Sequence, residues 1–437
     1  MPLSSPATAA PLGPWPGPPA PAEERLRALV AWALATGRPL AVWSEPGARH
    51  WQLLISRSLE AAYTGLPPAL EPAAPAGFAF FPFRDSDHNP ALFLPADLLF
   101  GSAQPDSVAV AEPALWAEFL AHTATIPTPP AGAKRPGGLP AEGGVGMAVT
   151  AAPVPLPVAW PQAPSPLPAA ATEAEYAALV AAGVAAIRAG AVQKVVSSRA
   201  VQRALPPGFD ALTAVARLRR QYPQAFVSLV SAPGVGTWLG ATPEVLAEVL
   251  FDGRFRTMAL AGTQPLTAGL TPQNAIWRQK EIEEQALVAR YIVSCFKQLR
   301  LREYHETGPR TVAAGQLLHL RTDFAVDLGR VPFPSLGTDM LRLLHPTSAV
   351  GGMPKAAALD FIAQHEGYDR AYYSGFLGPV NVAAPGVARL FVNLRCMQLR
   401  GTTAILYAGT GLTADSEPER EWRETELKLQ TVAAVLQ

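Results

Sequence analysis

Pairs of short strand-like segments joined by tight turns recur through the C-terminal half of this 437-residue chain. Residues 226–231 and 237–240 flank an Ala-Pro-Gly-Val-Gly turn, and residues 387–399 and 403–408 flank Arg-Gly-Thr. Such short connections join antiparallel strands, because parallel neighbours need a crossover of a dozen residues or more. We expect isolated long helices between these pairs, over residues 172–188, 272–302, 354–365 and from 417 onward. The pattern predicts an α+β fold with mostly antiparallel sheets.

The 46 prolines are concentrated in two segments. Residues 1–22 are rich in proline and alanine and carry no charge, and residues 127–169 are again rich in proline, alanine and glycine. Such segments bury little apolar surface and lose the backbone donors that helices and sheets require. We therefore expect four parts: a disordered tail at 1–22, an N-terminal part of the fold at 23–126, a long, partly extended connection at 127–169 and a C-terminal region at 170–437. The N-terminal part is expected to contain a helix at 24–36 and strands at 40–43, 51–55 and 77–82.

Charge and cysteine content restrict the partners of this protein. With 35 basic and 35 acidic residues the net charge is zero, which gives no electrostatic footprint for nucleic acid or an anionic membrane. The two cysteines, Cys295 and Cys396, suggest neither a disulfide framework nor a zinc site, and fit a reducing compartment. No apolar run reaches the ~18 residues needed to span a bilayer, and no signal-peptide pattern is present. We expect a cytoplasmic protein that acts on a small molecule.

Capping boxes mark the start of two predicted helices, Thr172 with Glu175 and Ser416 with Glu419. The second helix is therefore expected to start near Glu417. At about 100° per residue, its sequence separates into two stripes. The apolar stripe predicts core packing and comprises Trp422, Thr425, Leu429, Val432 and Leu436. The polar stripe, Glu421, Glu424 and Lys428, can hold a cation and an anion, or it can be a solvated face with one Glu–Lys pair.

Three further ionisable residues stand among apolar or small neighbours. Lys194 shares a strand face with Val196, so it is either an edge-strand lysine that discourages aggregation or a functional group. Glu244 follows Pro243, where a strand breaks off. Glu284 heads a mostly apolar helical stripe and lies either at a rim or against a ligand, because burying an unpaired carboxylate is costly. The core stripe of that helix is expected to be Ile282, Ala286, Ala289, Val293 and Phe296.

Seven segments resemble the chorismate-utilising enzymes, and within them the isochorismate synthases, and they occur in the same order. They are KVVSSR (194–199), GATPE (240–244), LAGT (260–263), KEIEEQALV (280–288), HPTSAVGGMPK (345–355), NLRCMQL (393–399) and AGTGLTADSEPEREWRETELK (408–428). The resemblance is strong over residues 172–437 and loose over the N-terminal part. It implies two mostly antiparallel sheets packed as a core with helices outside, and an Mg²⁺-dependent isomerase acting on chorismate, a cyclohexadiene dicarboxylate with an enolpyruvyl ether.

The resemblance also implies the catalytic pair. Lys194 corresponds to the general base that activates water for attack at ring carbon C2, and Glu244 to the acid that protonates the departing C4 hydroxyl. Because an acid and a base must hold opposite protonation states at one pH, the pKa of Glu244 must be raised and that of Lys194 lowered by burial and neighbours. The reaction is a reversible transposition of a hydroxyl group.

By the same resemblance, Glu284 and Glu424 bind the Mg²⁺ that neutralises the ring carboxylate, and Glu421 supports the ion through water. Arg395, which is expected in mid-strand, matches the arginine that grips the enolpyruvyl carboxylate with its planar fork, and Tyr373 adds a hydroxyl. The other implied substrate-binding residues are the backbone donors Gly262, Thr263, Gly409 and Gly411, Lys428 near the ring carboxylate, Ala349, and His319, which either orients near the substrate or is structural.

Individual residues separate the members of this group. Ammonia-using members, the anthranilate and aminodeoxychorismate synthases, carry glutamine at the position of Lys194, so water is the expected nucleophile. Ala261 stands where aminodeoxychorismate synthases carry a nucleophilic lysine. Ala349 stands where enzymes that go on to eliminate pyruvate carry threonine, so the reaction is expected to stop at isochorismate. Two departures, Gln285 for histidine and Gly351 for serine, leave metal affinity and pocket shape open.

Two other interpretations remain. A salicylate synthase would also eliminate pyruvate, and a non-catalytic chorismate-binding protein would keep the fold without turnover. Isochorismate feeds menaquinone, siderophore and salicylate pathways. Menaquinone is expected here because the segment FAFFPFRDSDH at 78–88 resembles menaquinone-type proteins. We expect a monomer.

Overall fold

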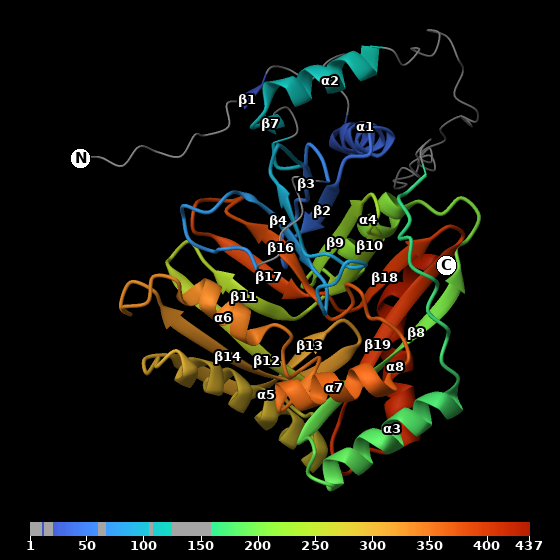
Figure 1. Ribbon diagram of the computed structural model, residues 1–437, viewed down its shortest axis with the longest axis vertical. Helices are drawn as coiled ribbons and strands as arrows, with labels where there is room; N and C mark the ends of the chain where they lie inside the picture. Colours follow the sequence, from blue (N-terminus) through green and yellow to red (C-terminus); the bar gives the residue numbers. More distant parts are fainter. Residues whose placement is uncertain (1–10, 13–20, 60–66, 105–107, 125–158) are drawn as a thin grey trace, which may run out of the picture.

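The computed structural model describes residues 11–12, 21–59, 67–104, 108–124 and 159–437, whose strands form two antiparallel sheets (Figure 1). The larger sheet contains, in spatial order, β1 (Pro11–Leu12), β7 (Val108–Val110), β6 (Leu98–Gly101), β3 (Gln52–Ile55), β2 (Leu40–Ser44), β9 (Phe226–Ala232), β10 (Gly236–Thr242), β18 (Cys396–Arg400), β19 (Thr403–Leu412), β8 (Lys194–Ala204) and β15 (Gly352–Met353). The smaller sheet contains β13 (His305–Ala314), β14 (Leu317–Asp327), β12 (Arg254–Pro265), β11 (Val245–Val249), β17 (Ala388–Val392), β16 (Phe376–Val380), β4 (Gly77–Phe81) and β5 (Leu92–Pro95). The predicted α+β class with antiparallel sheets is confirmed.

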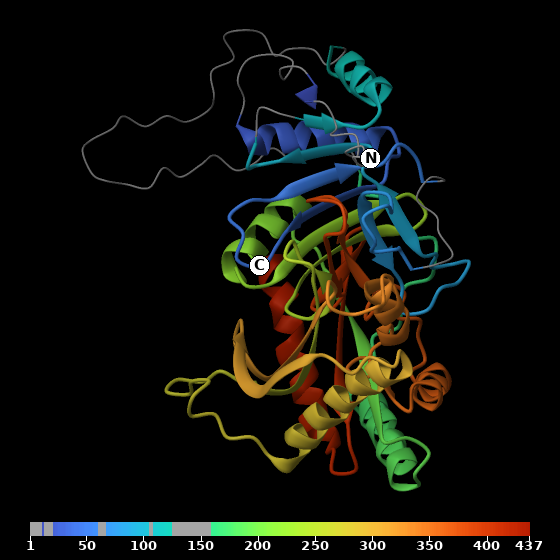
Figure 2. The ribbon, with the colours of Figure 1, turned by 90° about the vertical axis from the view of Figure 1, so that its left-hand side faces the viewer.

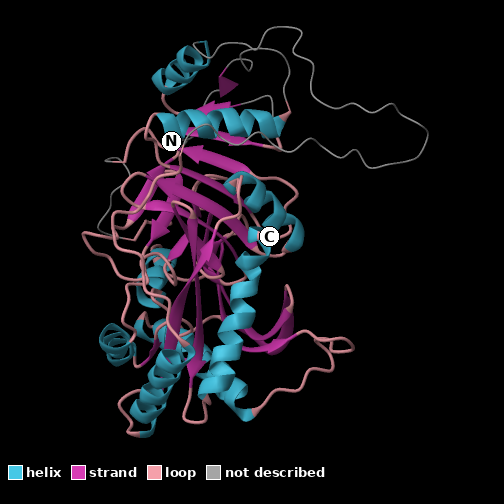
Figure 3. Ribbon diagram, turned by 90° about the vertical axis from the view of Figure 1, so that its right-hand side faces the viewer, coloured by secondary structure: helices cyan, strands magenta, loops and turns pink. Residues whose placement is uncertain are grey.

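Helices cover the outer faces of both sheets (Figure 3). Those on the larger sheet are α1 (Ala22–Ala35), α2 (Pro113–Ala124), α4 (Ala211–Gln221) and α8 (Pro418–Ala433). Those on the smaller sheet are α5 (Gln279–Gln298) and α6 (Leu336–Leu344), while α3 (Glu173–Arg188) and α7 (Lys355–His365) pack on β8. Figure 2 shows α8, in red, running beside the strands.

Side-chain alternation along the strands explains this layered arrangement. In β2, Leu40 and Val42 belong to the apolar cluster under α1 and α4, whereas Ala41 and Trp43 belong to the cluster between the sheets. Strand β4 alternates in the same way, with Phe80 between the sheets. Because successive side chains point to opposite faces, a fully apolar strand can serve both the central layer and an outer layer.

The N-terminal part completes both sheets. Strand β2 pairs with β9, which extends the larger sheet through β3, β6 and β7, and β4 pairs with β16 and extends the smaller sheet. Figure 1 shows α1 and α2 at the end of the molecule that carries these added strands, opposite α3, α5 and α7. The segments predicted at 23–126 and 170–437 therefore share the same two sheets.

Two strands pass from one sheet to the other, and these crossings lie side by side. Strand β10 of the larger sheet continues through Pro243 and Glu244 into β11 of the smaller sheet. Strand β17 of the smaller sheet continues into β18 of the larger one through a segment that ends at Arg395. The N–H of Ala241 donates to the carbonyl of Arg395 at 3.1 Å, and the N–H of Val392 donates to that of Glu244 at 3.0 Å. The two crossings thus place Glu244 next to Arg395.

Several local predictions require correction. Arg395 does not lie in mid-strand: it occupies the crossing, with φ of 49°, because the chain changes sheets there. The predicted disordered tail at 1–22 is wrong for Pro11–Leu12, which pair with β7. Its other residues before 21, and residues 127–158 of the predicted connection, lie outside the described residues. The described end of that connection lies along the larger sheet, where the carbonyl of Pro161 accepts from Thr237 at 3.2 Å.

Helix α5 begins at Gln279, seven residues after the predicted start. Asn274 accepts from the N–H of Thr271 at 2.6 Å, and this local turn competes with helix formation. The predicted core stripe is wrong for Ile282, which is 46% exposed, and for Ala286, which is also exposed. It is right for Phe296, which is buried, while Ala289 and Val293 are partly buried against the core. The residues that the helix buries are Glu284, Gln285, Leu287, Val288, Tyr291, Ile292, Cys295 and Phe296.

The capping predictions had opposite outcomes. The box formed by Thr172 and Glu175 is present at the start of α3. The box predicted for Ser416 is not, because its hydroxyl accepts from the N–H of Thr413 at 3.1 Å and Glu417 is the N-cap, ahead of Pro418. No helix in the described part of the chain has both the length and the apolarity needed to cross a bilayer.

Candidate active site

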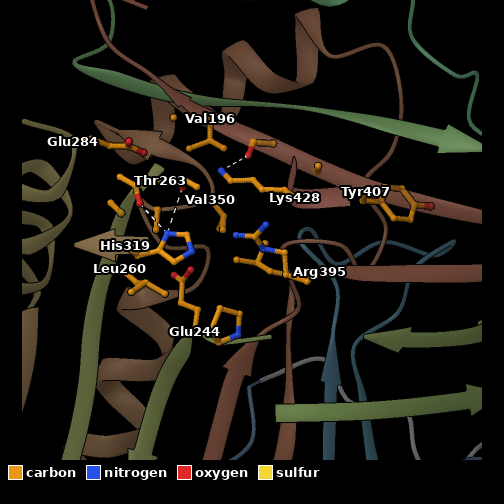
Figure 4. Close-up of a pocket in the computed structure, with 18 of the residues that line it drawn as sticks. Val196, Glu244, Leu260, Thr263, Glu284, His319, Val350, Arg395, Tyr407 and Lys428 are labelled. Atoms are coloured by element: carbon orange, nitrogen blue, oxygen red, sulfur yellow. Dashed lines mark hydrogen bonds between the residues drawn. The ribbon is translucent and has the colours of Figure 1, made fainter. Parts of the chain in front are cut away.

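A cavity of about 630 Å³, including its mouth, lies between the sheets beside the two crossings. It gathers residues from segments that lie far apart in the sequence, including every predicted substrate-binding residue. Its lining comprises Val196, Pro243, Glu244, Leu260, Ala261, Gly262, Thr263, Glu284, His319, Ala349, Val350, Tyr373, Leu394, Arg395, Tyr407, Ala408, Gly409, Gly411 and Lys428. In Figure 4 the side chains of Glu244, His319, Arg395 and Lys428 point toward a common centre. Of the predicted site residues, Lys194, Glu421 and Glu424 lie behind this wall.

Lys194 is fully buried, at 0% exposure. Its Nζ lies 3.2 Å from Oε1 of Glu284, which lines the cavity. The backbone of Lys194 pairs with Met353 of β15 on the outer side of β8, so this lysine is not an exposed edge residue. The interpretation of an edge lysine that discourages aggregation is therefore wrong, because the side chain points to the interior and finds a carboxylate there.

Glu244 projects into the cavity from the first crossing and is 5% exposed. Burial raises the pKa of its carboxyl to about 7, although the positive charges of Lys194, Arg395 and Lys428 act in the opposite direction. Among these charges, that of Lys194 lowers the pKa of Glu244 most. Glu244 can therefore hold a proton near neutral pH and release it in the presence of a nearby cation.

His319 lies on β14 with its ring against the bulge of β12. Its Nδ1 is 2.8 Å from the carbonyl of Gly262, a geometry in which Nδ1 carries the proton and donates it. Nε2 is buried and has no hydrogen-bond partner among the described residues. Burial, followed by the charge of Arg395, lowers the pKa of His319 to about 3. The histidine is thus neutral and offers Nε2 as a hydrogen-bond acceptor inside the cavity.

Three carboxylates beside the cavity each meet a lysine. Glu284 pairs with Lys194, Glu424 with Lys428 at 2.6 Å, and Glu421 with Lys280. Burial acts to raise the pKa of Glu424, but Lys428 and Lys280 lower it overall. The pKa of Glu421 is raised by burial and by the charge of Glu424. The lysines thus balance a concentration of negative charge at the junction of α5 and α8.

This oxygen-rich set fits Mg²⁺, which prefers a few carboxylates together with water and substrate oxygens. Oε2 of Glu421 is buried and makes no hydrogen bond to any described residue. Within the described ranges, no three His, Cys, Asp or Glu side chains converge closely enough to hold a metal ion by themselves. An ion here would therefore need ligands from water or from a bound carboxylate.

Arg395 and the edge of β19 supply hydrogen-bond donors for anions. Nη1 of Arg395 is buried without a partner among the described residues. The carbonyl of Gly409 accepts from Nζ of Lys428 at 2.8 Å, so it points away from β8. In an antiparallel strand the N–H of a residue points to the same side as its carbonyl, and residues two apart share that side. The N–H groups of Gly409 and Gly411 therefore face the cavity side, where the pairing of β18 with β19 ends at Leu406.

Gly262 and Thr263 form a bulge between β12 and β14. The register shifts between Ala261 and Gln264, so these two residues leave the hydrogen-bonded ladder. Gly262 has φ of 66°, a left-handed conformation that glycine adopts without strain. Both residues line the cavity, and the carbonyl of Gly262 accepts from Nδ1 of His319.

Two features of the site were missed by the sequence interpretation. Lys280 precedes Glu284 by one helical turn in KEIEE, a spacing that predicts a pair of these two residues, but Lys280 pairs with Glu421 of α8 instead. The buried pair Arg370 and Glu366, separated by 2.6 Å, supports the cavity from behind. The supporting role of Arg370 could be recognised only in the fold, because the carbonyls to which it donates belong to the distant residues Val196 and Val350.

Comparison with known proteins gives an independent result. A family model described as chorismate binding enzyme matches residues 161–437. The isochorismate synthase EntC of Escherichia coli strain K12 is 30% identical over 267 residues, or 59% of this chain and 66% of the relative. The salicylate biosynthesis isochorismate synthase of Pseudomonas aeruginosa is 33% identical over 271 residues, or 60% of this chain and 54% of the relative. The chain thus spans between 54% and 66% of the length of these curated relatives.

The fold also has solved counterparts. The menaquinone-specific isochorismate synthase MenF from Escherichia coli aligns over 93% of this chain and 91% of its own, with a TM-score of 0.67 and 20% identity. At this identity the likeness concerns the architecture alone. It extends over the N-terminal strands, where the sequence resemblance is loose.

Proposed function

The chain belongs to the family of chorismate-binding enzymes, and on that premise we propose that it is an isochorismate synthase. The proposed reaction adds water at ring carbon C2 of chorismate and removes the hydroxyl group from C4. Water enters and water leaves, so the overall change is a reversible isomerisation.

One observation supports this proposal above the others: a buried lysine and a buried, protonatable glutamate flank the same cavity. Lys194 reaches the cavity wall between Glu284 and Gly411, and Glu244 lines the cavity directly. A general acid is most effective when its pKa lies near the working pH, and the pKa of Glu244 is about 7. A protein that only bound a dicarboxylate could use the charge of Lys194, but it would not need the protonatable carboxyl group of Glu244.

The proton transfers follow from these positions. In its neutral amine form, which the role of general base requires, Nζ of Lys194 accepts a proton from water while the water oxygen bonds to C2. Glu244 donates its proton to the C4 oxygen, the C–O bond breaks and water leaves as the ring double bonds shift. In the reverse direction the two groups exchange their proton roles. Neutral His319 takes no part as an acid, and its Nε2 accepts a hydrogen bond from a hydroxyl group or water.

Charge complementarity supports a dicarboxylate substrate. Arg395, whose Nη1 has no partner among the described residues, suits bidentate binding of the enolpyruvyl carboxylate, and Tyr373 lines the same cavity. Lys428 and the N–H groups of Gly409 and Gly411 suit the ring carboxylate. Mg²⁺ held by Glu284 and Glu424, with Glu421 through water, would neutralise the ring carboxylate when bound.

Product analysis tests the reaction. Purified protein is incubated with chorismate and Mg²⁺, with and without EDTA, and the products are separated by chromatography. Isochorismate alone, formed only with Mg²⁺, is the expected result. Salicylate and pyruvate as the main products would instead identify a salicylate synthase, and unchanged chorismate would identify a binding protein.

Two variants test the assigned roles. Lys194→Ala and Glu244→Gln should each reduce kcat by at least about 100-fold, the scale of a lost general base or acid. The exposed Lys297→Ala and Glu419→Gln serve as matched controls that should retain wild-type turnover. Wild-type rates in either cavity variant would show that the roles are wrongly assigned.

We further propose that the product serves menaquinone biosynthesis and that the protein acts as a cytoplasmic monomer. The resemblance of residues 78–88 to menaquinone-type proteins supports the pathway. Rescue of menaquinone production in a host without its own menaquinone-specific isochorismate synthase tests it. Sedimentation analysis tests the monomer.

A further inference from the structure

A second, larger cavity adjoins the candidate active site. Its volume is about 1610 Å³, including its open mouth, and it shares Pro243, Leu260 and Arg395 with the first cavity. Strand β14 connects the two as well, since His319 lines the first cavity and Arg321, two residues further on the same face, lines the second. The two cavities therefore meet along the inner face of the smaller sheet.

The proposed catalytic pair is buried, so a substrate reaches it only through a cavity. Lys194 is 0% exposed and Glu244 is 5% exposed. Arg395 stands where the cavities meet, with Nη1 free of partners among the described residues. A carboxylate that passes through the second cavity would therefore reach Arg395 before it enters the first cavity.

The charges in the second cavity are not balanced. Four arginines and one glutamate, Glu248, line it. Arg389 is neutralised by Glu248 at 2.8 Å and also by Glu45, and Arg321 donates to Asp323 at 2.7 Å.

Arg256 is the other arginine that lines the second cavity away from the first cavity, and its side chain is exposed. Glu248 lies directly opposite Arg256 in the register of β11 and β12, but its carboxylate binds Arg389 instead. Arg256 consequently has no ion-pair partner in the described part of the chain. It shares a face of β12 with Met258 and Leu260, which continue toward the active site.

We propose that the second cavity is the access route of the dicarboxylate substrate and that Arg256 steers this substrate toward Arg395. The proposal rests on the proposed function. An unneutralised cation at the mouth of a cleft raises the local concentration of an anion and its rate of association. Arg256 therefore acts before the chemical step, in binding, and does not touch the reacting atoms.

Charge reversal with salt titration is the first test. Arg256→Glu should reduce kcat/KM about three- to tenfold at low ionic strength, within the range of electrostatic steering, and leave kcat unchanged. The loss should shrink to less than about twofold at 0.3 M salt, because screening shortens the reach of exposed charges. The matched control is Arg203→Glu, an exposed arginine that lines neither cavity and changes the net charge equally.

Chemical modification separates the effect of the charge at position 256 from any effect of the substitution on folding. Both native cysteines are buried, and burial raises their thiol pKa values, so an introduced exposed cysteine should react selectively. Arg256→Cys is treated with a methanethiosulfonate carrying either a sulfonate or a trimethylammonium group. The anionic adduct should lower kcat/KM as Arg256→Glu does, and the cationic adduct should restore it. Arg203→Cys should respond to neither reagent.

Equal losses with both adducts, a loss that salt does not reduce, or a fall in kcat would each overturn the proposal. Chorismate binding is also measured by calorimetry in the Glu244→Gln background with the same substitutions and salt series. The access route can then be judged even if the wild-type chain forms no isochorismate, so failure of the proposed function remains distinguishable.

Discussion

At the residue scale, Glu244 is controlled by burial more than by its charged neighbours. Burial raises its pKa from 4.5 to about 7 even though Lys194 and Arg395 oppose the shift. The folded state therefore holds this proton more tightly than the unfolded state. The resulting stabilisation is fully present below pH 4.5 and is lost as the pH rises to about 7, where the folded carboxyl ionises in a buried site.

Glu244→Gln removes this dependence, because an amide stays neutral at every pH. Relative to wild type, the variant should gain about 3 kcal/mol of unfolding free energy between pH 4.5 and pH 8, the equivalent of the pKa shift. Denaturant unfolding without substrate or Mg²⁺ measures the difference. The exposed Glu419→Gln should show no comparable trend. A difference that does not change with pH would mean that Glu244 ionises in the folded protein as it does in water.

Gly411 leaves room for the side chains of Glu284 and Lys194. A Cβ at this position would lie 1.9 Å from Oε1 of Glu284 and 2.9 Å from Cε of Lys194. Gly411→Ala should therefore displace both groups and reduce kcat/KM about 100-fold, as expected for a misplacement on the ångström scale. Steady-state kinetics and circular dichroism measure activity and folding. Gly101→Ala, whose Cβ would make an ordinary contact of 3.5 Å, is the control and should keep full activity.

At the element scale, a buried ion pair fixes the position of β8 and of the loop before β15. Arg370 donates to Glu366 and also to the carbonyls of Val350 and Val196, each at 2.7 Å. Glu366 accepts from the N–H of Ser198 at 2.7 Å. Both side chains of the pair are 1% exposed, and Val196 and Val350 line the candidate active-site cavity. The pair thus ties the end of α7 to two walls of the cavity.

Arg370→Met should destabilise the protein by about 3–5 kcal/mol, because it leaves a buried carboxylate without its partner. Adding Glu366→Gln should recover part of that loss, since the stranded charge is then removed. Denaturant unfolding of the single and double variants gives both values. Arg423→Met breaks an exposed pair with Glu419 and should cost less than about 1 kcal/mol. Equal stabilities for Arg370→Met and Arg423→Met would contradict this role.

At the scale of the whole molecule, the candidate metal residues connect the two outer helical layers. Glu284 comes from α5 on the smaller sheet, whereas Glu421 and Glu424 come from α8 on the larger sheet. A ligand bound between these helices would hold the two sheets together across the cavity. Binding to the folded state alone adds unfolding free energy in proportion to the logarithm of ligand concentration.

Mg²⁺ at about 100 times its dissociation constant, with chorismate present, should therefore stabilise the protein by about 2.7 kcal/mol. Thermal unfolding during an Mg²⁺ titration measures the gain, and EDTA should abolish it. The double variant Glu284→Gln/Glu424→Gln should show no Mg²⁺-dependent shift, whereas Glu419→Gln should behave as wild type. A full shift in the double variant would place the ion elsewhere.

Local sequence patterns predicted much of the fold and misplaced particular boundaries. The hairpin of β9 and β10 and the cap of α3 follow from turn and capping residues, which act within a few positions. The start of α5 and the cap at Ser416 were predicted wrongly, because Asn274 accepts a local hydrogen bond from the N–H of Thr271 and Ser416 accepts one from the N–H of Thr413. The buried face of α5 was predicted only in part: Glu284 and Phe296 are buried, whereas Ile282 is exposed, because the sheet that the helix covers decides which residues are buried.

The sequence by itself determined the residue types at the site, because ordered motifs carry a lysine, a glutamate and the carboxylates whose chemistry suits one class of substrate. Only the tertiary structure decided how they meet. Glu244 faces Arg395 because two strands change sheets side by side, and Lys280 neutralises Glu421 because α5 lies next to α8. These contacts join residues more than 100 positions apart, and such distances are set by strand order and packing, which the periodicity of a local segment does not encode.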